Sequence, residues 1–274
     1  MGSSVRINLN GLQGKAISFF RDGIPTDYLG NTFNIAFLSP NTLERVDVYK
    51  GIVPVELGAD ALGGALNFIS KKNRQNIVEL SHEVASYNTH RSAINAYYKN
   101  DADQFVKLTS FFNYSDNNYK VDVKLRNPDT RNLEDIRAER FHDTFLSSFS
   151  ELQLGALNLT WADEISISGG ASLSRDDVQN SLQMIQAFGR ARLLQDGFFG
   201  ALNYRKSLND RLSIDFFGAH GQHTTSTIDT ALQVFNWLGE VERRQGFTRG
   251  EVNNGNISLA EFMVNERVGR LLLK

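Results

Sequence analysis

Cysteine is absent from the 274 residues, proline occurs only four times, and no long apolar run is present. Without cysteine, disulfide bonds and thiolate metal sites are excluded. The most apolar stretch, 51–70, is interrupted by Glu56 and Asp60, so no helix of about 18 apolar residues can span a membrane. The net charge of −2 gives no electrostatic support for nucleic-acid binding.

Catalytic motifs are missing as well. No nucleophile elbow, zinc-protease helix or histidine-bearing catalytic motif is found. His220 and His223 are the closest histidines, but three residues apart in a strand they would point to opposite faces, which makes a poor metal pair. We therefore expect no enzyme, no cofactor and no metal site.

What the sequence has instead is alternation. Phenylalanine is frequent, with 19 residues, and from residue 76 onward apolar and polar residues alternate with the period of a strand. The clearest case has apolar odd positions and polar even ones: Ile165, Ile167, Ala171 and Leu173 against Ser166, Ser168 and Ser172. A mean hydropathy of −0.32 is compatible with a transmembrane β-barrel, because each strand carries one apolar and one polar face.

The pattern predicts a mostly β fold. The expected strands are 76–86, 91–99, 104–115, 142–160, 164–175, 190–206 and 211–226, with another beginning near 266. The links after the second, fourth and sixth strands are short, whereas 116–141, 176–189 and 227–265 are long; only the first link, near 87–90, breaks this rule because it is short. Outer-membrane barrels sort their connections in this way, with short periplasmic turns and long outer loops.

The stretch 43–72 carries the densest group of special positions. A strand, Leu43-Glu-Arg-Val-Asp-Val-Tyr49, leads into a Lys50-Gly51 turn. Glycines at 58, 63 and 64 permit tight turns and close backbone approach, and they precede Leu66-Asn-Phe-Ile69. Further upstream, Asp22-Gly23 followed by Pro25 is a tight-turn signature.

These positions closely resemble the end of the plug domain of TonB-dependent outer-membrane receptors. The family pattern is met at Glu44, Arg45, Asp47, Lys50, Gly51, Gly58, Gly63, Gly64 and Asn67, and Asp22 and Gly23 resemble its Asp-Gly-Ile/Val-Pro element. The segment 113–123 is similar to one found in Bacteroidetes-type members.

The resemblance implies two domains. Residues 1–72 would be the C-terminal part of a plug, and residues 73–274 would be the first seven or eight antiparallel strands, the N-terminal third of a barrel of about 22 strands. Met1-Gly-Ser-Ser lacks the features of a secretory signal. We therefore expect a fragment without the signal, the TonB box or the later strands.

The resemblance also implies a function. The protein would lie among the lipids of the outer membrane of a Gram-negative bacterium and import a scarce nutrient, powered by the proton-motive force through the TonB–ExbB–ExbD complex. The Lys50-Gly51 turn and Gly63-Gly64 differ from the pattern of glycan importers, which favours a ferric siderophore or similar small chelate. The alternatives are a glycan-importing receptor and a soluble β-rich binding or adhesion module.

Two groups of site residues follow. The charged residues Arg45, Asp47 and Lys50 are either a solvated face or part of a set of contacts that hold the plug in the barrel. The aromatic residues Tyr119, Phe235 and Trp237 of the expected outer loops could stack on a ligand or form the aromatic girdle at the outer lipid interface.

Overall fold

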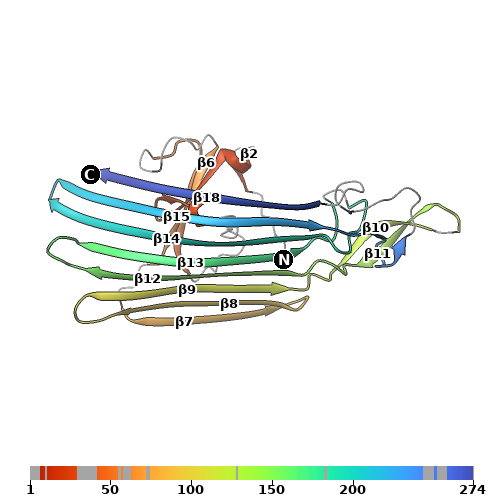
Figure 1. Cartoon of the computed structure of the whole chain (residues 1–274), viewed down its shortest axis with the longest axis horizontal. Coiled ribbons are helices and arrows are strands. Elements are labelled where there is room, and N and C mark those ends of the chain that lie inside the picture. Colours follow the sequence, from red (N-terminus) through yellow and green to blue (C-terminus); the bar gives the residue numbers. More distant parts are fainter. Residues whose placement is uncertain are drawn as a thin grey trace.

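The computed structural model describes residues 7–9, 11–29, 42–54, 57, 63–71, 75–127, 129–181, 184–242, 250–251 and 258–273. A small sheet from the first part of the chain lies against one face of a large antiparallel sheet (Figure 1). Short hairpins extend from one end of the large sheet. In the described part of the chain, no helix has the length and hydropathy needed to cross a membrane.

The small sheet has four strands in the order β4-β3-β6-β5. They are β3 (Ile17–Arg21), β4 (Ile24–Pro25), β5 (Leu43–Tyr49) and β6 (Gly64–Ser70). β3 and β6 are parallel, and the other two pairs are antiparallel. β1 (Asn8–Leu9) pairs with β2 (Leu12–Gln13), and the short 3-10 helices η1 (Gly14–Ala16) and η2 (Asp27–Leu29) flank β3 and β4.

Two glycine-containing turns in this sheet follow from the sequence. Asp22 and Gly23 have φ of 53° and 78°, the left-handed pair that a two-residue type I′ hairpin requires, and they join β3 to β4. Gly64 has φ of 125°, and a Cβ there would lie 2.3 Å from the Tyr49 carbonyl oxygen. Only glycine allows β6 to begin so close to the end of β5.

The large sheet has eight strands, all antiparallel to their neighbours, in the order β18-β15-β14-β13-β12-β9-β8-β7. The strands are β7 (Ile77–Ala85), β8 (Thr89–Lys99), β9 (Gln104–Ser115), β12 (Phe145–Leu157), β13 (Glu164–Asp177), β14 (Arg192–Asn209), β15 (Leu212–Asp229) and β18 (Ser258–Leu273). The first seven lie close to the expected ranges. The eighth begins at Ser258 and not near 266, because β18 pairs with the whole length of β15, starting opposite Asp229.

The connections keep the expected parity. Those after β8, β12 and β14 are short, and those after β9, β13 and β15 are long, so the long ones gather at one end of the sheet (Figure 1). Within this loop end, β10 (Lys120–Arg126) and β11 (Leu133–Glu139) form a protruding hairpin, and β16 (Val234–Phe235) pairs with β17 (Val241–Glu242). Both hairpins lie in segments that the sequence analysis treated as loops.

The large sheet has two different faces. Residues paired across neighbouring strands share a face, and Ser166, Ser172 and Ser174 share theirs with the buried Phe149 and the core that faces the small sheet. The opposite residues of β13 point outward, and Ile167 is 58% exposed. The expected division of 165–173 into two faces is confirmed. His220 is exposed and His223 buried, so the two histidines also lie on opposite faces.

The apolar residues of the outward face, such as Ile167 and Leu173 on β13, form a belt that runs obliquely across the strands. Toward the loop end it is followed by Arg175 on β13, Asp196 on β14 and His220 on β15. Asp196 of β14 pairs with Leu173 of β13, which is two residues closer to the short turns than Arg175 is. His220 of β15 pairs with Gly200 of β14, which is four residues closer to the short turns than Asp196 is. The belt edge therefore steps toward the short turns with each strand, as expected when strands cross an apolar layer at the tilt of a barrel.

Candidate functional site: the interface between the sheets and the long loops

An aromatic anchor attaches the small sheet to the large one. Tyr28 of η2 is 5% exposed, and its ring contacts Phe199 edge-on at 5.4 Å and Phe217 at 5.6 Å between ring centroids. Edge-to-face pairs of this kind contribute about 0.5–1.5 kcal/mol beyond the area that they bury. Burial raises the pKa of the Tyr28 phenol above its ordinary value, so it stays neutral. Leu29 and Ile24 complete the small-sheet side of this core.

The backbones also approach closely beside this anchor. A Cβ on Gly221 of β15 would lie 1.9 Å from the Tyr28 carbonyl oxygen, which no side chain can accommodate without separating the two parts. Gly221 is therefore the point at which the large sheet makes room for η2.

We expect Gly221→Ala in the full-length protein to destabilise the docked small sheet by about 1–3 kcal/mol, the usual cost of overpacking. The measurement is the urea dependence of thiol labelling at an introduced Ala93→Cys, because Ala93 is 7% exposed within the shared core. Gly269→Ala is the matched control, since nothing lies within 4 Å of a Cβ there. Equal labelling of both variants would contradict the close approach.

A buried ion pair joins the same two parts. Arg21 of β3 donates from Nη2 to Glu151 Oε2 of β12, and their side chains are only 14% and 9% exposed. Burial alone would lower the pKa of Arg21, but the charge and hydrogen bond of Glu151 together with the neighbouring Tyr28 and Asp22 outweigh it and raise the pKa above its ordinary value. The pair therefore crosses the interface with both side chains largely buried.

Weaker polar contacts surround this pair. Arg270 of β18 donates from Nη1 to the Gly23 carbonyl oxygen. Lys107 Nζ of β9 lies 3.4 Å from the Lys71 carbonyl oxygen, and Lys71 Nζ lies 2.5 Å from Glu79 Oε1. The interface thus combines one aromatic anchor with a small number of charged contacts.

The predicted residues Asp22, Gly23 and Asn67 meet at the hairpin turn. Asp22 Oδ1 accepts from the Ser70 backbone N–H at 2.9 Å, and Asn67 Oδ1 accepts from the Gly23 N–H at 2.9 Å. Because Gly23 also binds Arg270, this turn lies directly at the interface. A role of these three residues in holding the plug stays a prediction.

The predicted glycines differ in their surroundings. A Cβ on Gly63 would lie 2.9 Å from the Ala16 carbonyl oxygen, whereas Gly51, with φ of 87°, has open space around it. Both Gly63 and Gly64 therefore serve close backbone packing. Gly58 lies outside the described residues.

The charged residues of β5 are not in the buried interface. Arg45 Nε binds Asp47 Oδ1 at 3.0 Å and approaches Glu44, but the Arg45 side chain is 58% exposed. Lys50 is exposed too. Arg45 has its partner within the small sheet, and a role of Arg45, Asp47 and Lys50 in holding the plug stays a prediction. The buried ion pair between the two parts, however, belongs to Arg21, which the sequence analysis did not single out.

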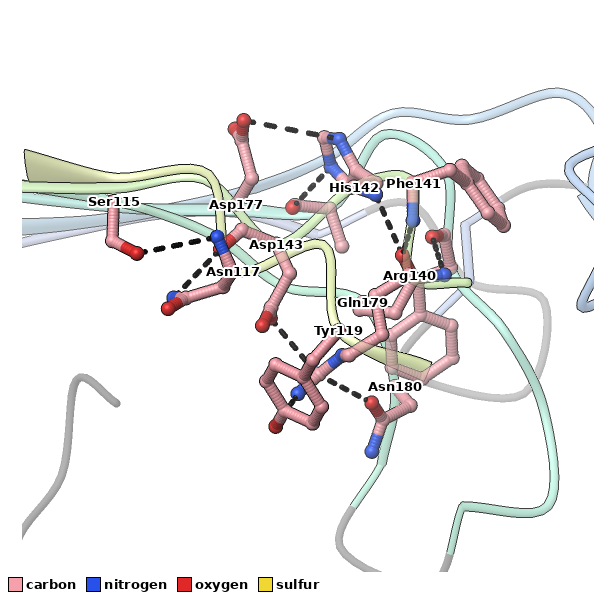
Figure 2. Close-up of polar contacts among 12 residues, drawn as sticks. Ser115, Asn117, Tyr119, Arg140, Phe141, His142, Asp143, Asp177, Gln179 and Asn180 are labelled. Carbon is pink, nitrogen blue, oxygen red and sulfur yellow. Dashed lines mark hydrogen bonds and ion pairs between the residues drawn. The ribbon is translucent and has the colours of Figure 1, made fainter. Parts of the chain in front are cut away.

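A polar network gathers at the loop end of the large sheet (Figure 2). Arg140 binds Asp143 Oδ1 at 2.8 Å, Asn180 Oδ1 at 2.8 Å and the Tyr119 hydroxyl, and its guanidinium lies 5.0 Å from the Tyr119 ring centroid. Burial raises the pKa of Asp143 to about 7; Arg140 opposes this shift and Asp176 adds to it. Arg140 thereby ties the end of the β10–β11 hairpin to the loop that follows β13.

Gln179 and Glu251 hold the neighbouring loop backbones. Gln179 Oε1 accepts from the backbone N–H groups of Phe141 at 2.8 Å and His142 at 2.6 Å. The Glu251 carboxylate accepts from three consecutive backbone N–H groups, those of 189–191. The described parts of the long loops are thus cross-linked by buried polar side chains.

The three predicted aromatic residues lie within this loop structure. Trp237 is 3% exposed and packs in a small core with Val123, Ala138 and Ala187. Phe235 contacts Phe141 at 6.3 Å between centroids, and Tyr119 contacts Tyr87 at 5.8 Å. An open cleft of about 490 Å³ is lined by Trp237, Leu238, Phe141, Arg140, Glu139 and Asp116. Neither open alternative, ligand contact or aromatic girdle, is tested by this arrangement.

Comparison with known proteins gives a family match at the start of the chain. Residues 1–65 match the TonB-dependent Receptor Plug Domain. No sequence among the curated proteins matches significantly.

Solved structures match the fold across nearly the whole chain. The ferric-catecholate import receptor Fiu of E. coli is 13% identical with a TM-score of 0.58, covering 98% of this chain and 40% of its own. The copper transporter OprC is 13% identical with a TM-score of 0.61, covering 96% and 36%. The siderophore receptor PiuA of Acinetobacter baumannii is 14% identical with a TM-score of 0.56, covering 84% and 32%.

The chain therefore spans about a third to two fifths of these proteins, between 32% and 40% of their length. The small sheet occupies the matched plug region, and the large antiparallel sheet corresponds to part of an open barrel wall. Residues 1–65 of this chain therefore match the plug domain of TonB-dependent receptors, and the described chain shares its fold with part of the solved receptors and transporters named above.

Proposed function

We propose that the full-length receptor imports a ferric siderophore or a similar small chelate across the outer membrane, driven by the TonB–ExbB–ExbD complex. We also propose that residues 1–72 belong to the plug and residues 73–274 to the barrel wall. The observation that carries this proposal is the plug sheet docked on the wall through one aromatic anchor and a few charged contacts, chiefly Arg21 to Glu151.

Such an interface suits a plug that must be held closed and still be displaced. An entirely apolar interface would have to be separated as a whole before the plug could move. The ion pairs of this interface can instead exchange their partners for other polar groups in a wet lumen. At the loop end of the wall, the described parts of the long loops are cross-linked by Arg140 and Glu251. Tyr119, Phe235 and Trp237 are the aromatic residues of these loops that we propose as ligand contacts.

The choice of cargo rests on two further points. The Lys50-Gly51 turn and the Gly63-Gly64 pair depart from the glycan-importer pattern described above. Two of the structural neighbours are named as siderophore or ferric-catecholate receptors, although another is named as a copper transporter. A glycan-importing receptor is the rival within the same family.

Energised uptake by cells tests the proposal. The experiment compares a strain that lacks the receptor gene with the same strain complemented by that gene. Accumulation of radiolabelled iron is measured from a panel of ferric siderophores, with and without a protonophore. We expect the deletion and the protonophore each to abolish accumulation of at least one chelate. Normal iron accumulation combined with lost growth on an oligosaccharide would replace this cargo by a glycan.

A further inference from the structure

A second cation lies beside the buried ion pair and is not used by it. Glu151 of β12 pairs across the strands with Thr109 of β9. Lys107 lies two residues before Thr109 on β9 and on the same face. Diagonal neighbours of this kind lie within reach of long side chains. Arg21 and Lys107 also line one small cavity of about 10 Å³, close to the volume of a single water.

Lys107 is poorly satisfied where it is. Among the described residues, Lys107 has one hydrogen bond, the 3.4 Å contact with the Lys71 carbonyl oxygen, and it forms no ion pair with any of them. An ammonium group partly removed from water normally has a better partner than a single long contact. The buried carboxylate that lies diagonally opposite Lys107 on the wall is Glu151, which is occupied by Arg21.

We propose that Lys107 is the substitute partner of Glu151, which takes over the carboxylate when Arg21 leaves with the plug. The proposal rests on the proposed function, since it describes how the plug is released during transport. Withdrawal of Arg21 would otherwise leave Glu151 as an uncompensated charge on the wall, which is the costly part of breaking a buried pair. With Lys107 beside it, the carboxylate exchanges one cation for another and the barrier to release falls. Lys107 is thus a positioning residue for the moving plug, whereas Arg21 holds the plug on the wall through its ion pair with Glu151.

The test is a double-mutant cycle on the full-length receptor in vesicles, read by maleimide labelling of Ala93→Cys as the sole thiol. Lys107→Met should slow labelling about threefold to tenfold when Arg21 is present, because the released state loses its substitute ion pair. In the Arg21→Ala background Lys107 already pairs with Glu151 in the docked state. There Lys107→Met should speed labelling by a similar factor. Lys107→Arg keeps the charge and should label like the parent in both backgrounds.

A change of sign between the two backgrounds supports the proposal. A Lys107→Met effect in the same direction in both would overturn it, since that is what a mere packing role produces. Labelling needs no ligand and no TonB complex. If the receptor imported no chelate at all, the proposed function would fail while the labelling cycle would still decide on the ion-pair exchange.

Discussion

Alanine at Glu151 is expected to destabilise the docked plug by about 3–5 kcal/mol, the usual cost of removing one partner of a buried pair. The loss is large because the carboxylate faces two cations. Arg21 is directly bound and only 14% exposed, and Lys107 lies diagonally beside Glu151 on the neighbouring strand. Without Glu151, both positive charges remain in the interface and repel each other.

Labelling at Ala93→Cys and passive entry of small antibiotics into cells measure this effect together. Arg45→Ala is the matched control: its pair with Asp47 is 58% exposed on the arginine side, so we expect a loss within about 1 kcal/mol. If Arg45→Ala released the plug as readily as Glu151→Ala, the contact that holds the plug would lie at β5 and not at β3. Ligand affinity at the outer loops should stay the same in both variants.

The strands and their faces could be predicted from the sequence because each depends on local alternation. The face of the sheet on which a residue such as Ile167 lies can be inferred from the alternation of its immediate neighbours. Because one face is buried, the register of the strands is fixed as well. The type I′ turn at Asp22-Gly23 is equally local. For the same reason the β10–β11 hairpin could have been found: Val121, Val123 and Leu125 alternate with charged residues before a turn at 127–132.

The ion pair could not be predicted in this way. Arg21 and Glu151 are 130 residues apart, and neither stands in a pattern that marks it as buried. Their pairing depends on where the plug sheet docks, which is decided by Tyr28 and Gly221 through three-dimensional packing. Arg45 attracted the prediction because its strand matches a family motif, but β5 is the edge strand of its sheet and leaves that side chain exposed. Trp237 is a comparable case, since its burial depends on the missed hairpin.

Arginine at Ile167 is expected to destabilise the full-length receptor by about 2–4 kcal/mol, the cost of a cation facing lipid near the bilayer midplane of a barrel. Ile167 is 58% exposed on the outward face, and its cross-strand neighbours Leu154 and Leu202 are both apolar. The oblique belt places this row well inside the apolar layer on β13. The large exposed area is thus explained by lipid, for which a guanidinium is a poor neighbour.

Ser168→Arg is the control, because Ser168 is the adjacent residue on the plug-side face, opposite Gln153. A polar lumen accepts a charge, so this variant should be nearly neutral. The urea dependence of folding in lipid vesicles measures both. A receptor whose strands stood in water on both faces would tolerate either arginine equally, and that result would contradict the membrane-embedded register. A loss confined to Ile167→Arg ties the apolar belt to lipid, because the two substitutions add the same side chain to neighbouring positions of one strand and differ only in the face that receives it.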